Sequence, residues 1–326
     1  MAAFTGGSLL YGTVGRPDLV SADLTQQLAR SQYRSAHRLG ELPEDVEVYP
    51  THGFGSFCSA SQDQSVAAST IGQERKDNIA FQIDDESRFV ESILAALAPH
   101  PTYYAYMGAA NLAGPDAGEL PPVAALDAEE LRARLERGEW VIDLRSRKAF
   151  AKEHLRGEAG FELSSSFVTY VGWIVPWNTP VTLVGDTQED VRKAQRDLSL
   201  IGFDAISGAV VGPFDTLASG AETSSYRVAT FSDLADAVSS GKSPAILDVR
   251  REDEWVEGHI SGAQNIPIHE VADRIGEVPE GPVWVHCAGG FRASIAASLI
   301  DRAGKEVVMV DDSFDQAKAA GLELTG

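Results

Sequence analysis

The stretch VWVHCAGGFRASIAASLI, residues 283–300, decides which fold and chemistry we expect in the last third of the chain. Its apolar start predicts a strand that runs into Cys287, and its small-residue end predicts a helix. Between them lies a loop made of Ala288, Gly289, Gly290, Phe291 and Arg292. In a strand-loop-helix unit the backbone N–H groups of the loop gather at the helix N-terminus and form a cradle for an anion, and glycines permit its tight curve. We expect these N–H groups and the Arg292 guanidinium to favour the thiolate form of Cys287.

The same order of strand and helix patterns occurs twice in the chain. Asp143 and His154 are 11 residues apart, as are Asp248 and His259, and an offset of 105 residues relates the two pairs. Each aspartate ends a short apolar run of the kind that forms a buried strand. The repeated spacing indicates an internal duplication.

A second match supports the duplication. PVTLVG at 180–185 matches PVWVHC at 282–287 with an offset of 102, and a helical pattern follows each. Earlier in each copy another helix is expected, with Asp127 as N-cap in one and Ser232 in the other. Alternating strands and helices predict an α/β fold with largely parallel sheets flanked by helices.

Two stretches have the composition of linkers, one rich in Pro and Gly at 112–123 and one small and polar at 219–225. They predict three domains, at 1–112, 123–218 and 226–326. The first has no repeat of the later pattern. In it we expect strands at Ser8–Tyr11 and Val46–Tyr49, and helices at Ser21–Leu39, ended by Gly40, and at Phe89–Leu97.

Charge and composition exclude several classes of partner. The net charge of −21 disfavours binding to nucleic acid and to anionic membranes. The apolar run at 170–177 is far shorter than the ~20 residues of a membrane-spanning helix. The two cysteines, Cys58 and Cys287, do not form a disulfide framework, which suits a reducing compartment, so we expect a cytoplasmic protein. A homo-oligomer is compatible with the sequence.

The last domain resembles the rhodanese sulfurtransferases. CAGGFR (287–292) fits their C-x-x-G-x-R loop, whereas cysteine phosphatases use a longer C-x5-R loop. LDVRREDEW (247–255) and GHISGAQNIP (258–267) extend the resemblance over nearly the whole domain. It implies that Cys287 is the nucleophile, that Arg292 holds an anionic donor, and that residues 288–291 form the substrate-binding loop.

The middle domain resembles a rhodanese domain without the reactive residues. At the offset of 102, Gly185 replaces Cys287, Gln188 replaces Gly290, and Asp190 replaces Arg292. We expect this domain to be structural.

The first domain resembles the C-terminal part of a metallo-β-lactamase-fold domain of the persulfide-dioxygenase and glyoxalase-II-like branch, which has an αββα architecture. The resemblance lies in TGGSLLYGTVGRPDL (5–19), YPTHGFGSFCSA (49–60) and TIGQERKDN (70–78). It implies iron or zinc ligands, but the sequence has no H-x-H-x-D-H motif, and Gly7 stands at the place of the bridging aspartate. His52 is then the single candidate ligand, as a relic, and the alternative is that it forms a hydrogen bond within its loop. One imidazole cannot hold a hydrolytic zinc, so we expect an incomplete domain and no cofactor, unless iron or zinc ligands are supplied from elsewhere.

We therefore expect a sulfurtransferase that takes sulfane sulfur from thiosulfate or a low-molecular-weight persulfide, through a Cys287 persulfide, to a thiol or cyanide. Its partners are a small anionic sulfur donor and a thiol acceptor. Two alternatives remain open: a metal-dependent persulfide dioxygenase or thiolester hydrolase, and a non-catalytic sulfur-binding module. Asp311 and Asp312, after the last predicted strand, are expected to repel an anionic donor.

The remaining polar residues are expected to be structural. Asp248 and Arg250 are predicted to form an ion pair, His259 to stabilise a turn by hydrogen bonding, His286 to pack in the core, and Cys58 to be a packed small residue.

Overall fold

The computed structural model describes residues 1–52, 68–114, 120–241 and 243–326. The chain forms two compact units, one of Met1–His100 with Tyr104–Ala109, the other of Pro101–Tyr103 with Ala110–Gly326. The two predicted repeats, 123–218 and 226–326, therefore belong to one unit.

The first unit contains a three-stranded sheet. β1 (Ala2–Gly6) pairs in parallel with β2 (Glu47–Pro50), which pairs antiparallel with β3 (Ser69–Thr70). The strand predicted at Val46–Tyr49 is confirmed as β2.

The strand predicted at Ser8–Tyr11 is wrong, because the chain turns directly after β1. The Ser8 amide donates to the Thr5 carbonyl at 3.0 Å, and the Leu10 amide donates to the Thr13 carbonyl at 2.9 Å. Leu9 and Leu10 are both buried. Two consecutive side chains reach the core from a turn, whereas a strand would point them to opposite faces.

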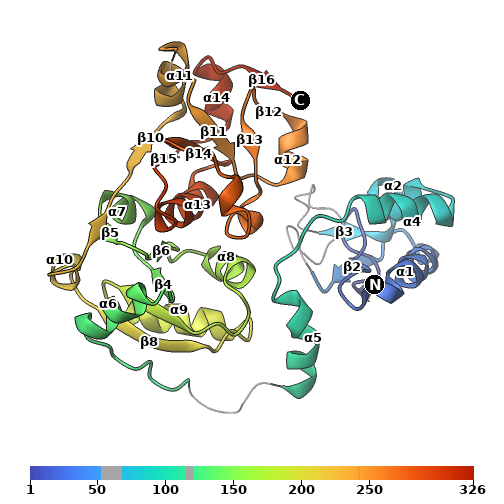
Figure 1. The fold of residues 1–326 in the computed structure, drawn as a ribbon. Coiled ribbons are helices and arrows are strands. Elements are labelled where there is room, and N and C mark those ends of the chain that lie inside the picture. Colours follow the sequence, from blue (N-terminus) through green and yellow to red (C-terminus); the bar gives the residue numbers. More distant parts are fainter. Residues whose placement is uncertain (53–67, 115–119, 242) are drawn as a thin grey trace. The chain divides into compact units, whose positions relative to one another are not determined.

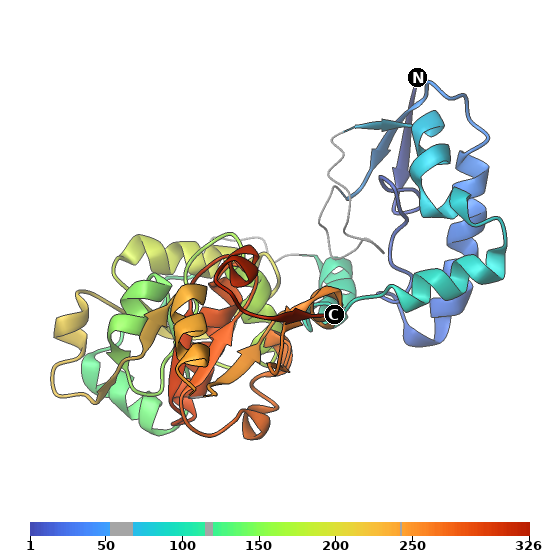
Figure 2. The same cartoon turned by 90° about the horizontal axis from the view of Figure 1, so that it is seen from above.

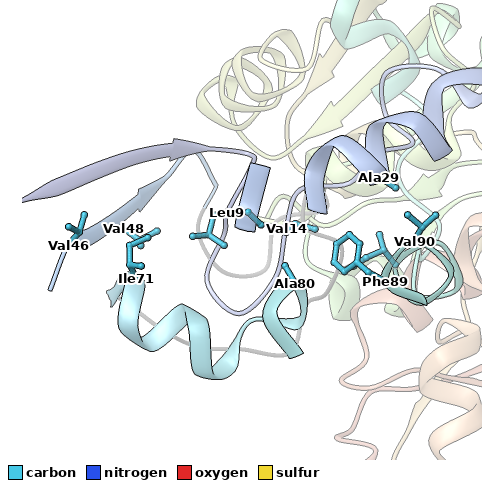
Figure 3. Packing of buried hydrophobic residues seen from close by; sticks show 11 residues of the cluster. Leu9, Val14, Ala29, Val46, Val48, Ile71, Ala80, Phe89 and Val90 are labelled. Carbon is cyan, nitrogen blue, oxygen red and sulfur yellow. The ribbon is translucent and has the colours of Figure 1, made fainter. Parts of the chain in front are cut away.

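Helices cover the small sheet of the first unit. α1 (Thr25–Leu39) ends at the Gly40 cap as predicted, after a single 3₁₀ turn at Ala22–Leu24, and α4 (Glu86–Ala95) confirms the last predicted helix of this unit. The other helices are α2 (Ile71–Asp77), α3 (Ile79–Gln82) and α5 (Tyr104–Ala113), the last of which spans the boundary between the units. Figure 3 shows the core, where Phe89 and Val90 of α4 pack near Ala29 of α1, and Val48 of β2 packs near Ile71 of α2.

The second unit holds two parallel sheets, as predicted. In the first repeat the strand order is β6-β4-β7-β8, and in the second it is β10-β15-β14-β11-β13. All of these pairings are parallel. The strands are β4 (Trp140–Asp143), β6 (Ala159–Gly160), β7 (Val181–Gly185), β8 (Ile206–Val211), β10 (Arg227–Ala229), β11 (Ala245–Asp248), β13 (Gln264–Asn265), β14 (Val283–His286) and β15 (Val307–Val310). Figure 2 shows the strands of this unit among its helices, an α/β architecture.

Helices connect the strands in both repeats. Those of the first repeat are α6 (Ala128–Glu136), α7 (Arg147–Lys152), α8 (Phe167–Ile174), α9 (Gln188–Ser199) and α10 (Phe214–Leu217). Those of the second are α11 (Phe231–Ser239), α12 (Glu252–Glu257), α13 (Phe291–Arg302) and α14 (Asp315–Ala319), with short 3₁₀ turns at Ile268–Glu270 and Ile275–Glu277.

The duplicated spacing corresponds to duplicated structure. Asp143 and Asp248 are fully buried, and each pairs with the arginine two residues later, at 2.5 and 2.7 Å. The Nδ1 atoms of His154 and His259 lie within hydrogen-bond distance of the carbonyl oxygen four residues earlier, at 2.8 and 3.0 Å. Each histidine begins a two-stranded antiparallel ribbon, β5 (His154–Leu155) with β9 (Thr223–Ser224), and β12 (His259–Ile260) with β16 (Leu324–Thr325). The internal duplication is therefore confirmed.

The predicted N-caps are right in one repeat and wrong in the other. The Asp127 carboxylate accepts a hydrogen bond from the Glu130 amide and caps α6. In the second repeat Thr230, not Ser232, caps α11, because its hydroxyl accepts from the Asp233 amide while the Asp233 carboxylate accepts from the Thr230 amide. This reciprocal pair satisfies two donors at once and starts the helix one residue before Ser232.

Helix α13 lies between the two repeats. It contacts β14 of its own repeat and β6 of the other, and Figure 1 shows it between these strands. Every residue from 293 to 300 is buried. Alanine and serine fill most of these positions, since small side chains let the helix approach both neighbours closely.

No helix among the described residues combines the length and apolar character that crossing a bilayer requires.

We predict that Arg250→Met lowers the free energy of unfolding by about 3 kcal/mol, because it leaves the fully buried Asp248 carboxylate without its cation. The control is Arg227→Met, which breaks an exposed pair with Asp233 and should cost less than about 1 kcal/mol. Urea unfolding followed by circular dichroism measures both, and equal losses would contradict the prediction.

Candidate active site

The predicted strand-loop-helix around Cys287 is present. β14 ends at His286, the loop follows, and α13 begins at Phe291. Gly290 is the N-cap of α13 with φ +86°, a left-handed conformation in which L side chains are strained. Cys287 is 2% exposed, whereas Ala288 and Gly289 beside it are exposed. Cys287 is therefore buried next to two exposed residues, at the carboxyl end of a central strand.

The loop presents backbone donors at a helix N-terminus. Among the described residues, the N–H groups of Ala288, Gly289 and Gly290 donate no hydrogen bond. On the opposite side of the loop, the Phe314 amide donates to the Ala288 carbonyl at 3.0 Å and braces it. Unpaired N–H groups at the N-terminus of a helix attract anions, so the geometry suits a bound or reacting anion at this place.

Arg292 lies beside the loop in a bidentate ion pair with Glu254 of α12. The two guanidinium nitrogens Nη1 and Nη2 donate to the two carboxylate oxygens at 2.5 and 2.8 Å. Burial raises the pKa of Glu254, but the hydrogen bonds and charge of Arg292 outweigh it, and the pKa of Glu254 falls below its usual value. A fork of this kind fixes the orientation of the guanidinium. Glu254 lies within the LDVRREDEW segment, but no local pattern indicated that it pairs with Arg292.

Tyr170 of α8 is a residue of the first repeat that lies beside the Cys287 loop. Its ring lies 5.6 Å from the Phe291 ring. Burial raises the pKa of Tyr170, Arg292 lowers it, and Cys287 and Glu254 raise it further, so the hydroxyl stays protonated near neutral pH. Tyr170 is 117 positions from Cys287 in the sequence, and no local pattern identified it.

Both aspartates after β15 have partners. The Asp312 carboxylate accepts from the backbone amides of Phe231 at 3.2 Å and Ser313 at 2.8 Å. Asp311 accepts from Arg147 Nε at 2.9 Å. The repulsion expected from these carboxylates is thus offset at Asp311 by a cation of the first repeat.

Asp248, Arg250 and His259, which were expected to be structural, have that role. The pair of Asp248 and Arg250 is confirmed, and the Arg250 guanidinium also lies 3.7 Å from the centre of the Phe314 ring. His259 Nε2 lies 3.1 Å from the Thr325 hydroxyl, which together with its contact to the Trp255 carbonyl confirms a turn-stabilising role. Cys58 lies outside the described residues.

His286 packs in the core, as predicted. It is fully buried, and the Phe231 and Phe314 rings lie 5.5 Å from it on two sides. Neither ring nitrogen has a hydrogen-bond partner in the described part of the chain. Burial lowers the pKa of His286 to about 4, so the imidazole is neutral near neutral pH.

The equivalent loop of the first repeat is closed by its own side chains. Thr187 caps α9, its hydroxyl accepting from the Asp190 amide at 3.2 Å, and the Asp190 carboxylate accepts from the Thr187 amide at 3.1 Å. Asp190 occupies the position that corresponds to Arg292. The Asp190 carboxylate therefore satisfies the Thr187 amide, which corresponds to the open Gly289 amide, and its negative charge disfavours an anion at this loop.

The described residues do not form a metal site. No three side chains of His, Cys, Asp or Glu among them are grouped to hold a metal ion. His52 is half-buried at the end of the described range 1–52.

Comparisons with known proteins support the resemblance to rhodanese domains in the region that contains the Cys287 loop. A model of the rhodanese-like domain family matches residues 230–320. The thiosulfate sulfurtransferase GlpE of Pseudomonas putida is 34% identical over 76 residues, which are 23% of this chain and 69% of that protein. The HTH-type transcriptional regulator Rv0324 of Mycobacterium tuberculosis is 38% identical over 82 residues, 24% of this chain and 36% of that protein.

The fold also resembles a solved metallo-beta-lactamase from Staphylococcus aureus, with a TM-score of 0.54 and 25% identity over 65% of this chain and 58% of that chain. The chain spans between 36% and 55% of the length of three of the curated relatives that it matches.

We predict that Gly290→Ala costs roughly 2 kcal/mol of stability or more. Its Cβ would lie 2.1 Å from Asp311 Oδ1, and the residue has a positive φ. Gly289→Ala is the matched control, because its Cβ meets nothing within 4 Å, and it should change stability by less than about 0.5 kcal/mol. Thermal unfolding distinguishes the two, and an unaffected Gly290→Ala protein would contradict the geometry.

We predict that His286 makes stability depend on pH. Its folded pKa of about 4 is below the unfolded value of about 6.5, so the unfolded chain takes up the proton first as the pH falls. The contribution is fully present above pH ~6.5 and decreases toward pH 4 by roughly 3 kcal/mol. His286→Leu should lose less stability than the parent over this range. The prediction is refuted if the free energy of unfolding changes equally with pH in the parent and in His286→Leu. It is also refuted if NMR shows that the His286 imidazole of the folded parent titrates near pH 6.5.

Proposed function

Because the chain belongs to the rhodanese family through residues 230–320, we propose that it is a sulfurtransferase in which Cys287 carries the transferred sulfur. The observation that carries this proposal is the loop itself. Cys287 ends a central strand, three backbone N–H groups beside it are without a hydrogen bond among the described residues, and Arg292 is held nearby.

The first half of the reaction loads the enzyme. The Cys287 thiolate attacks the outer sulfur of thiosulfate, the S–S bond of the donor breaks, and sulfite leaves with the electron pair. Cys287 becomes a persulfide. A low-molecular-weight persulfide serves in the same way, with a thiolate as the leaving group.

The second half unloads it. A thiolate or cyanide attacks the outer sulfur of the Cys287 persulfide, the bond to Cys287 breaks, and the Cys287 thiolate is regenerated. Two half-reactions through a covalent enzyme form give ping-pong kinetics.

The loop's contribution is electrostatic. The N–H groups of Ala288 to Arg292 at the start of α13 stabilise the thiolate and the persulfide anion, and they need no reorganisation because the Phe314 amide and Gly290 fix the loop. Arg292 attracts the anionic end of the donor. Its pair with Glu254 reduces its net charge but sets its direction.

The rest of the chain has a supporting role in this proposal. We infer that residues 123–218 are an inactive rhodanese-like domain, that 226–326 are the active one, and that 1–112 are the C-terminal part of a metallo-β-lactamase-like domain. The closed loop at Thr187 and Asp190 supports the inactive assignment.

We predict that Cys287→Ser lowers thiosulfate:cyanide sulfur transfer at least 1,000-fold, because a hydroxyl is a far weaker nucleophile than a thiolate near neutral pH. The matched control is Cys58→Ser, which changes the other cysteine of the chain and should keep activity within twofold.

Intact-mass spectrometry after thiosulfate treatment should show one added sulfur on the parent and none on Cys287→Ser. Unchanged turnover in Cys287→Ser would refute the proposal. An adduct without turnover would indicate a sulfur carrier instead of an enzyme.

A further inference from the structure

The carboxylate of Asp311 packs directly against the backbone of the Cys287 loop. Asp311 follows β15, its amide donates to the Ala229 carbonyl at 2.9 Å, and its side chain is 6% exposed. A Cβ built on Gly290 would lie 2.1 Å from Asp311 Oδ1 and 3.1 Å from Asp311 Cα. No loop side chain separates this carboxylate from the N-terminus of α13.

A negative charge at this place opposes the function proposed for the loop. The cradle attracts the Cys287 thiolate and an anionic donor because the start of α13 is positive. A nearly buried, uncompensated carboxylate cancels that field, since charges interact strongly where water is excluded. The field of the loop therefore depends on what neutralises Asp311.

The neutralising cation comes from the first repeat. Arg147, the first residue of α7, donates from Nε to Asp311 Oδ1 at 2.9 Å. Its Nη1 donates to Glu162 Oε2 at 2.7 Å, which fixes the guanidinium between the two carboxylates. Lys148 Nζ lies farther away, 3.6 Å from Asp311 Oδ2, and its side chain is 75% exposed. Arg147 is thus the closer and more buried partner of Asp311.

We propose that Arg147 of the inactive repeat is a positioning residue for the Cys287 loop, holding Asp311 against Gly290 and neutralising it. This inference rests on the sulfur transfer proposed above. It gives the repeat without a nucleophile a part in the reaction, as the supplier of a charge that the active repeat lacks at this position.

A double-mutant cycle tests the coupling. Arg147→Gln should lower kcat/KM for thiosulfate at least tenfold, and Arg147→Lys should recover part of the loss. In an Asp311→Asn background, the same Arg147→Gln change should have less than a threefold effect, because the carboxylate against Gly290 is gone, while Glu162 is present in both backgrounds. The matched control is Arg137→Gln, which breaks an exposed pair with Glu139 in the same repeat and should keep kcat/KM within twofold.

Alkylation provides a readout that a merely structural role would not change. In a Cys58→Ser background, the rates of reaction of Cys287 with anionic iodoacetate and with neutral iodoacetamide are compared. Arg147→Gln should lower the ratio of the two rates at least fivefold, and Asp311→Asn should restore it.

An unchanged ratio, or an equal loss of kcat/KM from Arg147→Gln in both backgrounds, overturns the inference. The same holds if Cys287 reacts with neither reagent in any variant. If no variant and no parent protein transfers sulfur, the proposed function fails, while the alkylation ratio still decides the role of Arg147.

Discussion

The site depends on the backbone N–H groups that the start of α13 leaves without partners beside Cys287. A helix always begins with donors that its own turns cannot satisfy, and a protein either caps them or offers them to a ligand. Here Gly290, in a left-handed conformation, places no side chain over these donors. The burial of α13 between two repeats then fixes where they point.

The two repeats show both solutions to this constraint. At the start of α9, the Thr187 hydroxyl and the Asp190 carboxylate satisfy the amides of Asp190 and Thr187, and the Asp190 charge disfavours an anion there. At the start of α13, the equivalent positions are Gly289 and Arg292, and the N–H groups of the loop remain available. Common framework features remain in both copies, including the buried Asp-Arg pair and the histidine that begins the ribbon. The repeats therefore share a fold and differ in whether side chains cap the helix N-terminus that follows the loop.

Arginines neutralise carboxylates near the Cys287 loop of this acidic chain. With a net charge of −21, a carboxylate near a thiolate or an anionic substrate needs a cation. Arg292 is paired with Glu254 and Asp311 with Arg147, so these two carboxylates beside the loop each face an arginine. Arg292 belongs to the second repeat and Arg147 to the first. Separating the repeats would remove the second cation from Asp311.

Local pattern was sufficient for most of the second unit. Apolar runs ending in Asp143 and Asp248 predicted the strands, repeated spacing predicted the duplication, and the segment from Cys287 to Arg292 predicted a glycine-containing loop before a helix. These features depend on neighbours within a few positions, which is why sequence reveals them. The strand predicted at Ser8–Tyr11 was wrong because its buried leucines lie in a turn. The N-cap predicted at Ser232 was wrong because Thr230 and Asp233 form a reciprocal cap.

The sequence by itself determined the loop, its nucleophile candidate and the absence of a cysteine and an arginine at the corresponding positions of the first repeat. Only the tertiary structure decided which side chains surround the loop. Arg147 and Tyr170 lie more than 100 positions from Cys287, and Glu254 lies on another helix, so their contacts arise from the packing of α7, α8 and α12 around α13. Electrostatic interactions act through space over a few ångströms, whereas sequence records only the order of residues, and the folded chain alone makes those distances short.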